Sequence, residues 1–309
     1  MIPRVFEGEA PPWEWGLALA GYGAGQAVER AALTSNGNRI EYRRGAVTEW
    51  YVNDERGLEQ GFTLAAPADP ASDQVPVAEL IALDRWALAR AAELQREIQA
   101  AYDSYEFHRV YQQLHNFCVV DLGSFYLDVI KDRLYTTGRK SLARRSAQTA
   151  MYHIIEAMVR WLAPVLSFTA EEIWTQLPGE RGDSVFLSTW YELPVVKSGG
   201  VADLDWKLLL RVRETAARAL EALRVSGAIG SGLDAQLTIF ADGQLLADMQ
   251  RLGDELRFVF ITSGAISRPA AERSASALPG EGFWVQAEPD SDAKCVRCWH
   301  RLPDTGKSA

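Results

Sequence analysis

Residues 141–174 limit what this chain can fold into more than any other segment. Apolar side chains recur there at helical spacing, and Glu156 and Arg160 form an i,i+4 charged pair on the opposite face. Pro164 cannot continue a helix, so we predict that this helix ends near Ala163. The segment therefore predicts a long helix, a break and a second helix, which is typical of a helical bundle.

The second of these helices has a predicted start. Thr169 and Glu172 have the spacing of a capping box, and Phe168 can pack on Ile173 as a hydrophobic staple. We therefore expect Thr169 to be the N-cap.

Length and composition indicate an ordinary globular protein. The chain has 309 residues, of which 48% are hydrophobic and 24% charged, enough for two or three domains. Its net charge of −9 argues against non-specific nucleic-acid binding by the whole surface but leaves room for a local basic face. We find no signal peptide, no apolar run that could span a bilayer and no disulfide framework, so we predict a cytoplasmic protein without a membrane partner.

Residues 1–64 read as a β-rich segment. Residues 39–44 and 47–52 have strand character and flank Gly45-Ala46, a pair suited to a type II′ hairpin turn, and residues 61–64 suggest a third strand. Residues 65–76 contain three prolines and many small side chains, which predicts a linker.

Helical periodicity dominates from residue 77 onward. We predict a first helix ending near Asp103 and then a long apolar stripe of buried residues: Phe107, Val110, Tyr111, Leu114, Cys118, Leu122, Phe125, Val129 and Ile130. His108 and His115 fall on the polar side and are expected at the surface. Further on, a helix from Trp206 is followed by segments predicted as strand (236–240), helix (245–256), strand (258–261) and strand (283–286), which indicates a small α+β module.

Positive charge is concentrated in residues 131–145. Six basic side chains share this stretch with one acid: Lys131, Arg133, Arg139, Lys140, Arg144 and Arg145. We interpret the stretch as a loop between two helices, with Tyr135 among its basic residues. Such a loop suits a phosphate backbone, although a solvated connector with basic residues near helix ends is the alternative.

A cysteine pair lies near the end of the sequence. Cys295 and Cys298 have the spacing of two zinc ligands, and His300 could add a third, but a structural site needs four. Zinc is therefore a candidate cofactor whose site we expect to be incomplete in this chain.

Several segments together resemble isoleucyl-tRNA synthetase. LAPVLSFTAEEIW (162–174) is similar to the signature that closes the anticodon-binding helical domain of class I aminoacyl-tRNA synthetases. Four others narrow the resemblance: FYLDVIKDRLY (125–135), RRSAQTAMYH (144–153), GDELRFVFITSGA (253–265) and KCVRCWH (294–300). The resemblance covers roughly residues 83–307.

The resemblance implies a mainly α fold. We expect an anticodon-binding helical domain over 77–195, a helix with a small α+β module over 196–290 and half of a zinc finger over 291–309, preceded by the β-rich segment 1–64 and the linker 65–76. The family completes the finger with a further cysteine pair, so we expect residues 291–309 to be mobile, to share no core with the helical domain and to leave Trp299 exposed.

The implied function is to bind the anticodon stem and loop of an isoleucine-accepting tRNA. Basic residues 131–145 would hold phosphates, and Arg297 and Trp299 would contact unstacked bases. The family uses ATP in a separate catalytic domain with HIGH-like and KMSKS-like motifs, and neither motif is in this sequence. We therefore expect no isoleucine activation by the chain alone. A helical protein-interaction module and a chimeric or truncated remnant without function are the alternatives.

Overall fold

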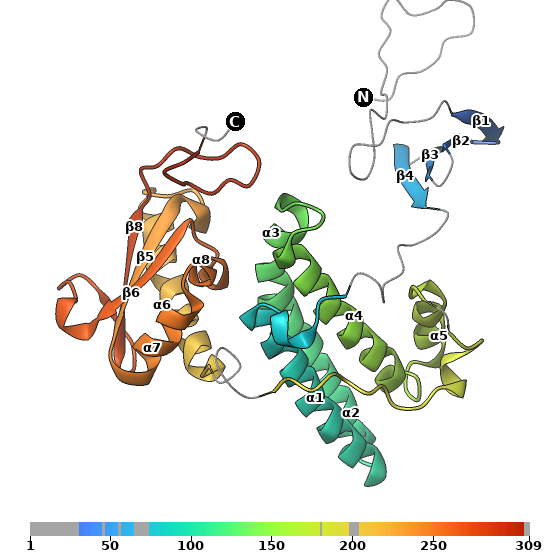
Figure 1. Ribbon diagram of the computed structural model, residues 1–309, viewed down its shortest axis with the longest axis horizontal. Coiled ribbons are helices and arrows are strands. Elements are labelled where there is room, and N and C mark those ends of the chain that lie inside the picture. The colour runs from blue at the N-terminus through green and yellow to red at the C-terminus, as the bar shows by residue number, and fades with distance from the viewer. Residues whose placement is uncertain are drawn as a thin grey trace, which may run out of the picture. The chain divides into compact units, whose positions relative to one another are not determined.

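The computed structural model describes residues 31–44, 47–54, 57–64, 74–179, 181–197 and 204–305 (Figure 1). The chain divides into two compact units, residues 1–72 and 73–309. Within the described residues, no helix is both long enough and apolar enough to cross a membrane.

The first unit contains a four-stranded antiparallel meander in the order β1-β2-β3-β4. Its strands are β1 (Ala32–Asn36), β2 (Arg39–Arg44), β3 (Val47–Asp54) and β4 (Gly57–Leu64). The two predicted central strands are confirmed, the third is longer than expected, and β1 was not anticipated. The predicted turn at residues 45–46 lies outside the described residues.

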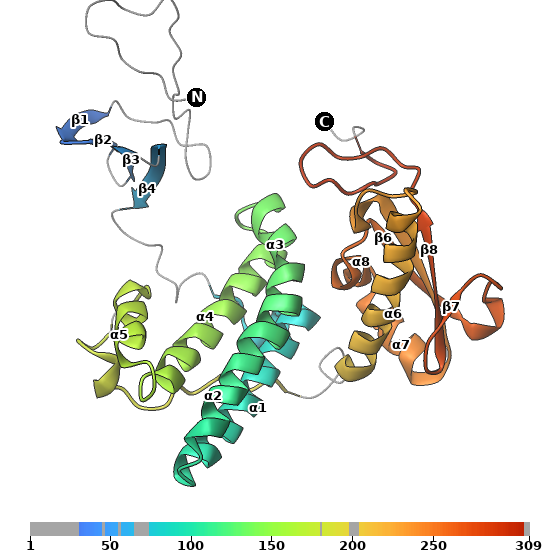
Figure 2. The ribbon, with the colours of Figure 1, turned by 180° about the vertical axis from the view of Figure 1, so that it is seen from behind.

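The second unit begins with a helical bundle (Figures 1 and 2). Its helices are α1 (Ala82–Asp103), α2 (Phe107–Asn116), the π-helix η2 (Phe117–Tyr126), α3 (Leu127–Thr136), α4 (Leu142–Leu162) and α5 (Ser167–Gln176). Fully buried side chains of α1, α3 and α4, among them Leu88, Ile98, Ile130 and Trp161, form the core. The bundle starts before α1, because the buried Val75 donates its N–H to Thr149 Oγ1 at 3.0 Å.

The π-helix η2 overturns one expectation. Its wider turns, closed by i→i+5 hydrogen bonds, shift the side chains around the axis relative to an α-helix. Phe117, Leu122 and Phe125 are buried, whereas Cys118 is exposed and not part of the core. The start of the predicted stripe is confirmed only in part, because α2 buries Val110 and Leu114 but leaves exposed the two aromatic residues Phe107 and Tyr111. His108 and His115 are at the surface as predicted.

Helix α4 ends at Leu162 with Ala163 as its C-cap, as Pro164 predicts. Its polar face is not free, since Thr149 and Glu156 are both buried. The predicted start of α5 is wrong. The helix begins at Ser167, where the hydroxyl donates to the Ala163 carbonyl at 3.0 Å.

Thr169 therefore lies within the first turn of α5 rather than at the cap. Phe168 is 93% exposed, so the expected staple to Ile173 does not form. The helix starts earlier than the sequence indicates because the turn after Pro164 is already hydrogen-bonded to the end of α4. The N–H groups of Val165 and Leu166 donate to the Leu162 carbonyl at 2.9 and 2.7 Å.

After the bundle come one long helix and a small mixed sheet. These elements are α6 (Trp206–Val225), β5 (Ala235–Ala241), α7 (Gly243–Leu252), α8 (Glu255–Phe260), β6 (Gly264–Pro269), β7 (Leu278–Pro279) and β8 (Phe283–Pro289). The sheet order is β6-β5-β8-β7, with β5 parallel to β6 and antiparallel to β8. The expected mainly α fold with a small α+β module is confirmed.

The strand predicted over residues 258–261 is wrong, because most of this apolar run belongs to α8. A short apolar run does not distinguish a buried strand from a buried helix. Ile261 ends the helix in the left-handed region, with φ 54°, and the strand β6 follows.

The tail, residues 291–305, is not independent of the rest of the unit. Its two ends pair through a bridge between Lys294 and Arg301, and Arg301 Nε donates to Asp234 Oδ1 at 3.0 Å. His300 Nε2 lies 3.0 Å from Asp132 Oδ2 on α3, so the tail also contacts the helical bundle. The expectation that the tail is unconnected to the bundle is therefore contradicted, whereas its mobility stays a prediction. The tail is held by contacts between side chains that are far apart in the sequence, which no local pattern reveals.

A candidate nucleic-acid interface

The basic residues 131–145 do not form one loop. Lys131 and Arg133 belong to α3, Arg139 and Lys140 lie in the turn after it, and Arg144 and Arg145 open α4. Ser141 is the N-cap of α4 and accepts the N–H of Arg144 at 3.3 Å. The positive charge is therefore arranged along two helix ends and the turn between them.

Arg133 is not available to nucleic acid. Its side chain is 1% exposed and donates through Nη1 to Asp84 Oδ2 at 3.1 Å, while Nη2 lies 3.6 Å from Glu255 on α8. Position 133 shares a helix face with Val129 and Ile130, so it turns into the core. Arg133 therefore joins α3 to α1 and α8, and its predicted role in RNA binding is wrong. The signal that could have revealed this was an acid, Asp84, at a core position of α1.

Other members of the basic stretch are accessible. Lys131, Arg139 and Lys140 are exposed, and Arg144 and Arg145 are partly buried. Lys131 Nζ lies 2.5 Å from Asp128 Oδ1, but both side chains face solvent to a large extent. Such a pair contributes only about 0.2–1 kcal/mol, so Lys131 can exchange its partner for a phosphate at little cost.

A cleft of about 380 Å³ lies between α3 and the tail. We call it the α3–tail cleft, and its lining residues are Asp128, Val129, Lys131, Asp132, Tyr135, Thr136, Leu233, Phe258, Ile261, Arg297, Cys298, Trp299 and His300. It brings together Lys131 and the pair Arg297 and Trp299, which are far apart in the sequence. Two aromatic rings at its edge are open to solvent, since Tyr135 is 79% and Trp299 64% exposed.

The backbone of the tail fixes the position of Trp299. Its φ is 64°, in the left-handed region that a tryptophan rarely adopts, and its N–H donates to the Cys295 carbonyl at 2.9 Å. A strained backbone of this kind persists where the surroundings hold it and is frequent at functional sites. The indole is thus exposed, as expected, but attached to a defined turn.

Sequence reasoning missed the apolar part of the cleft. Phe258 and Ile261 come from α8 and the residue after it, which were predicted to be a strand. Asp132 was noted only as the single acid of the basic stretch, yet it pairs with His300. No local pattern could have placed these residues beside Trp299.

The cysteine pair offers two metal ligands. Backbone N–H groups of Cys298 and Arg297 lower the pKa of Cys295, whereas burial raises the pKa of Cys298. Across the described ranges, no cluster of three or more His, Cys, Asp or Glu side chains could hold a metal ion. His300 Nε2 is turned to Asp132 instead. These residues alone do not fit a four-coordinate structural zinc site.

Comparison with known proteins identifies the class. A family model for the anticodon-binding domain of tRNA ligase matches residues 84–239, half of the chain. The chain belongs to this family, and the bundle with its basic α3–α4 turn is the corresponding domain.

Individual relatives are more specific. Isoleucine–tRNA ligase of Nitrosococcus oceani is 55% identical over 242 residues, covering 77% of this chain and 26% of that protein. The isoleucine–tRNA ligases of Methylococcus capsulatus and Stutzerimonas stutzeri are 51% and 50% identical, each matched over 26% of its own length. The resemblance to isoleucyl-tRNA synthetase is confirmed, and the chain spans about a quarter of the length of these relatives.

Proposed function

We propose that this chain binds the anticodon stem and loop of an isoleucine-accepting tRNA, as part of an isoleucine–tRNA ligase. The observation that carries the proposal is the α3–tail cleft, which joins exposed basic and aromatic side chains in a member of the anticodon-binding family. We further propose a cytoplasmic location, where charged tRNA is used.

The side chains divide the work by chemistry. Lys131, Arg139 and Lys140 contact phosphates, whose charge is independent of sequence. Tyr135 and Trp299 offer ring faces on either side of the cleft, on which unstacked loop bases can stack. Arg297 adds a planar guanidinium that can stack or hydrogen-bond to a base edge.

Binding of this kind orients tRNA but catalyses no reaction. Aminoacylation needs ATP, isoleucine and a catalytic domain, and the sequence of this chain holds neither of the two nucleotide-binding motifs of the family. Isoleucine-dependent pyrophosphate exchange by the chain should therefore remain at background. Exchange clearly above a protein-free control would contradict this division of labour.

A binding assay with stacking variants tests the proposal. Filter binding should retain isoleucine tRNA and its isolated anticodon stem-loop more tightly than an unrelated stem-loop. Trp299→Ala and Tyr135→Ala should each weaken binding by about 1–3 kcal/mol if a base stacks there. Phe168→Ala is the matched control, because Phe168 is an exposed aromatic residue outside the cleft. Equal effects of all three variants would reject the cleft as the binding site.

A further inference from the structure

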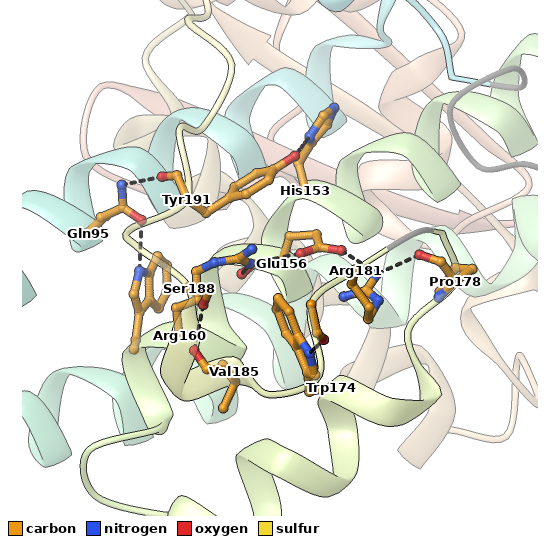
Figure 3. A network of polar contacts seen from close by, with 12 residues as sticks. Gln95, His153, Glu156, Arg160, Trp174, Pro178, Arg181, Val185, Ser188 and Tyr191 are labelled. Carbon is orange, nitrogen blue, oxygen red and sulfur yellow. Dashed lines mark hydrogen bonds and ion pairs between the residues drawn. The ribbon is translucent and has the colours of Figure 1, made fainter.

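A second pocket of about 340 Å³ lies where α4, α5 and residues 181–191 meet. We call it the arginine pocket, and its lining residues are Tyr152, Glu156, Arg160, Trp174, Arg181, Gly182, Ser184, Leu187, Ser188 and Tyr191. Figure 3 shows Glu156 between the guanidinium groups of Arg160 and Arg181, with Trp174 on one side and Tyr191 on the other. Its volume is at the lower end of the range of about 300–1,000 Å³ typical of small-molecule sites.

One carboxylate serves two cations in this pocket. Glu156 Oε2 lies 2.8 Å from Arg160 Nη1, and Oε1 lies 2.9 Å from Arg181 Nη2. Burial opposes ionisation of Glu156, but hydrogen bonds from the two arginines outweigh it and lower the pKa of this carboxyl. Glu156 is therefore ionised at neutral pH. Two guanidinium groups and one carboxylate leave the lining with an excess of one positive charge.

The arginine donors are only partly used. Nε of Arg160, and Nε and Nη1 of Arg181, are buried and have no hydrogen-bond partner among the described residues. Both guanidinium groups lie over the Trp174 ring, each 4.8 Å from its centroid, and Arg160 also lies 5.2 Å from the Tyr191 centroid. Buried donors without an acceptor are costly, and an anion that accepts from them offsets that cost.

We propose that the arginine pocket binds the phosphate group of a ribonucleotide, either free or within an RNA strand. The excess positive charge and the unused guanidinium donors select a phosphate, and arginine presents them in a fork that matches its oxygens. The tyrosine rings at residues 152 and 191 give a base a place to stack beside it.

This site is separate from the α3–tail cleft. The two pockets have no lining residue in common. The arginine pocket therefore does not depend on anticodon binding, and either site can fail without the other.

The indole N–H of Trp174 reports on the pocket, because it donates to the Gly182 carbonyl at 2.8 Å beside both arginines. Adenosine monophosphate, added to the full chain at constant ionic strength, should shift this NMR resonance saturably. Adenosine should not shift it, and inorganic phosphate should shift it in the same direction. The same shift with adenosine as with its monophosphate, or no shift with any probe, would overturn the proposal.

A negative charge introduced at the rim of the arginine pocket can be compared with one introduced outside the pocket. Leu187 lines the pocket and is 79% exposed, whereas Val195, on the same segment, is 80% exposed and outside it. Leu187→Glu should weaken binding of the nucleotide about two- to fivefold, the effect of one exposed charge–charge interaction, and Val195→Glu should leave it unchanged. Equal nucleotide affinities of the two variants would show that the phosphate does not bind in this pocket.

A further experiment distinguishes the two sources of the phosphate, a free nucleotide and an RNA backbone. A short single-stranded oligoribonucleotide without terminal phosphates should move the same Trp174 resonance if the natural ligand is an RNA backbone. If only the mononucleotide moves it, the site takes a free nucleotide. Both results support a phosphate site, and they differ in which molecule supplies it.

Discussion

Arg133 and Asp84 form a fully buried ion pair, with side-chain exposures of 1% and 0%. Asp84 also accepts hydrogen bonds from Tyr126 at 2.9 Å and from Ser146 at 2.5 Å. The pair therefore links α1 to η2, α3 and α4. Removing one partner leaves the other charge buried and alone, which typically costs about 3–5 kcal/mol.

Two glutamine variants, one single and one double, should separate charge that stabilises the fold from charge that binds RNA. Arg133→Gln should lower the free energy of unfolding by about 3–5 kcal/mol, measured in urea. At temperatures where the Arg133→Gln variant is folded, its affinity for tRNA should depend on salt concentration in the same way as that of the unmodified chain. Arg139→Gln combined with Lys140→Gln should leave stability within about 0.5 kcal/mol and reduce the slope of log K against log salt by about 0.7–0.9 for each phosphate that is no longer neutralised. An unchanged slope for the double variant would show that Arg139 and Lys140 neutralise no phosphate and belong to a solvated connector.

Asp234 fixes the tail electrostatically. Its side chain is 13% exposed, and Oδ1 lies 3.0 Å from both Lys294 Nζ and Arg301 Nε. Burial opposes ionisation, but the hydrogen bonds from Lys294 and Arg301 prevail and lower the pKa of Asp234 from 3.8 to about 2. A carboxyl whose folded pKa is depressed stabilises the protein above its unfolded pKa and loses that contribution as the pH falls through the folded pKa.

Stability should accordingly fall between about pH 4 and pH 2 by about 1–2 kcal/mol through Asp234 alone, allowing for solvent screening. Urea unfolding across that range should show this decrease in the unmodified chain and not in Asp234→Asn. Asp304→Asn, which removes an exposed carboxylate of the same tail, is the control and should behave like the unmodified chain. Parallel pH curves for all three proteins would show that the ion pairs of Asp234 do not matter.

Among the secondary-structure elements, η2 decides how the bundle closes. Ten residues, Phe117–Tyr126, keep π geometry between α2 and α3. Gly123 belongs to this geometry, because a Cβ added there would lie 2.9 Å from the Cys118 carbonyl oxygen. In an ordinary α-helix, replacing glycine by alanine is favourable by about 1 kcal/mol.

Gly123→Ala should therefore destabilise the protein by about 1–3 kcal/mol, the usual cost of an overpacked contact, instead of stabilising it. Differential scanning calorimetry measures the change. Gly138→Ala, in the α3–α4 turn, meets no atom within 4 Å and should change stability little. A more stable Gly123→Ala protein would mean that the segment reverts to an α-helix without penalty.

For the second unit as a whole, protein contacts join the tail to the bundle and to the sheet. His300 reaches Asp132 on α3, Arg301 reaches Asp234 beside β5, and the Cys295 N–H donates to the His300 carbonyl at 2.8 Å. His300, the candidate third ligand, is turned to Asp132 in the first of these contacts. Zinc stabilises a fold only where binding and ordering occur together.

A strong chelator should consequently leave the melting temperature unchanged within about 1 °C, because the tail is held by protein contacts and supplies only two thiolates. Replacing both cysteines by serine should likewise have little effect on melting. Stoichiometric zinc retained through purification, together with a marked fall in melting temperature on chelation, would contradict this prediction.

The sequence by itself determined the helices α1, α4 and α6, the end of α4 before Pro164 and the family. Apolar periodicity, proline sterics and short motifs are local properties that survive without tertiary context. It also selected Lys131, Arg297 and Trp299, although it could not show that they line one cleft.

Only the tertiary structure decided where side chains point. Arg133 turned inward because Asp84, forty-nine positions earlier, lies beside it, and Cys118 turned outward because η2 has wider turns than an α-helix. The tail was fixed by Asp132 and Asp234, and Glu156 was buried between two arginines, one of them twenty-five positions away. Except for the position of Cys118, each outcome depends on pairing between groups distant in the chain, which local spacing does not encode.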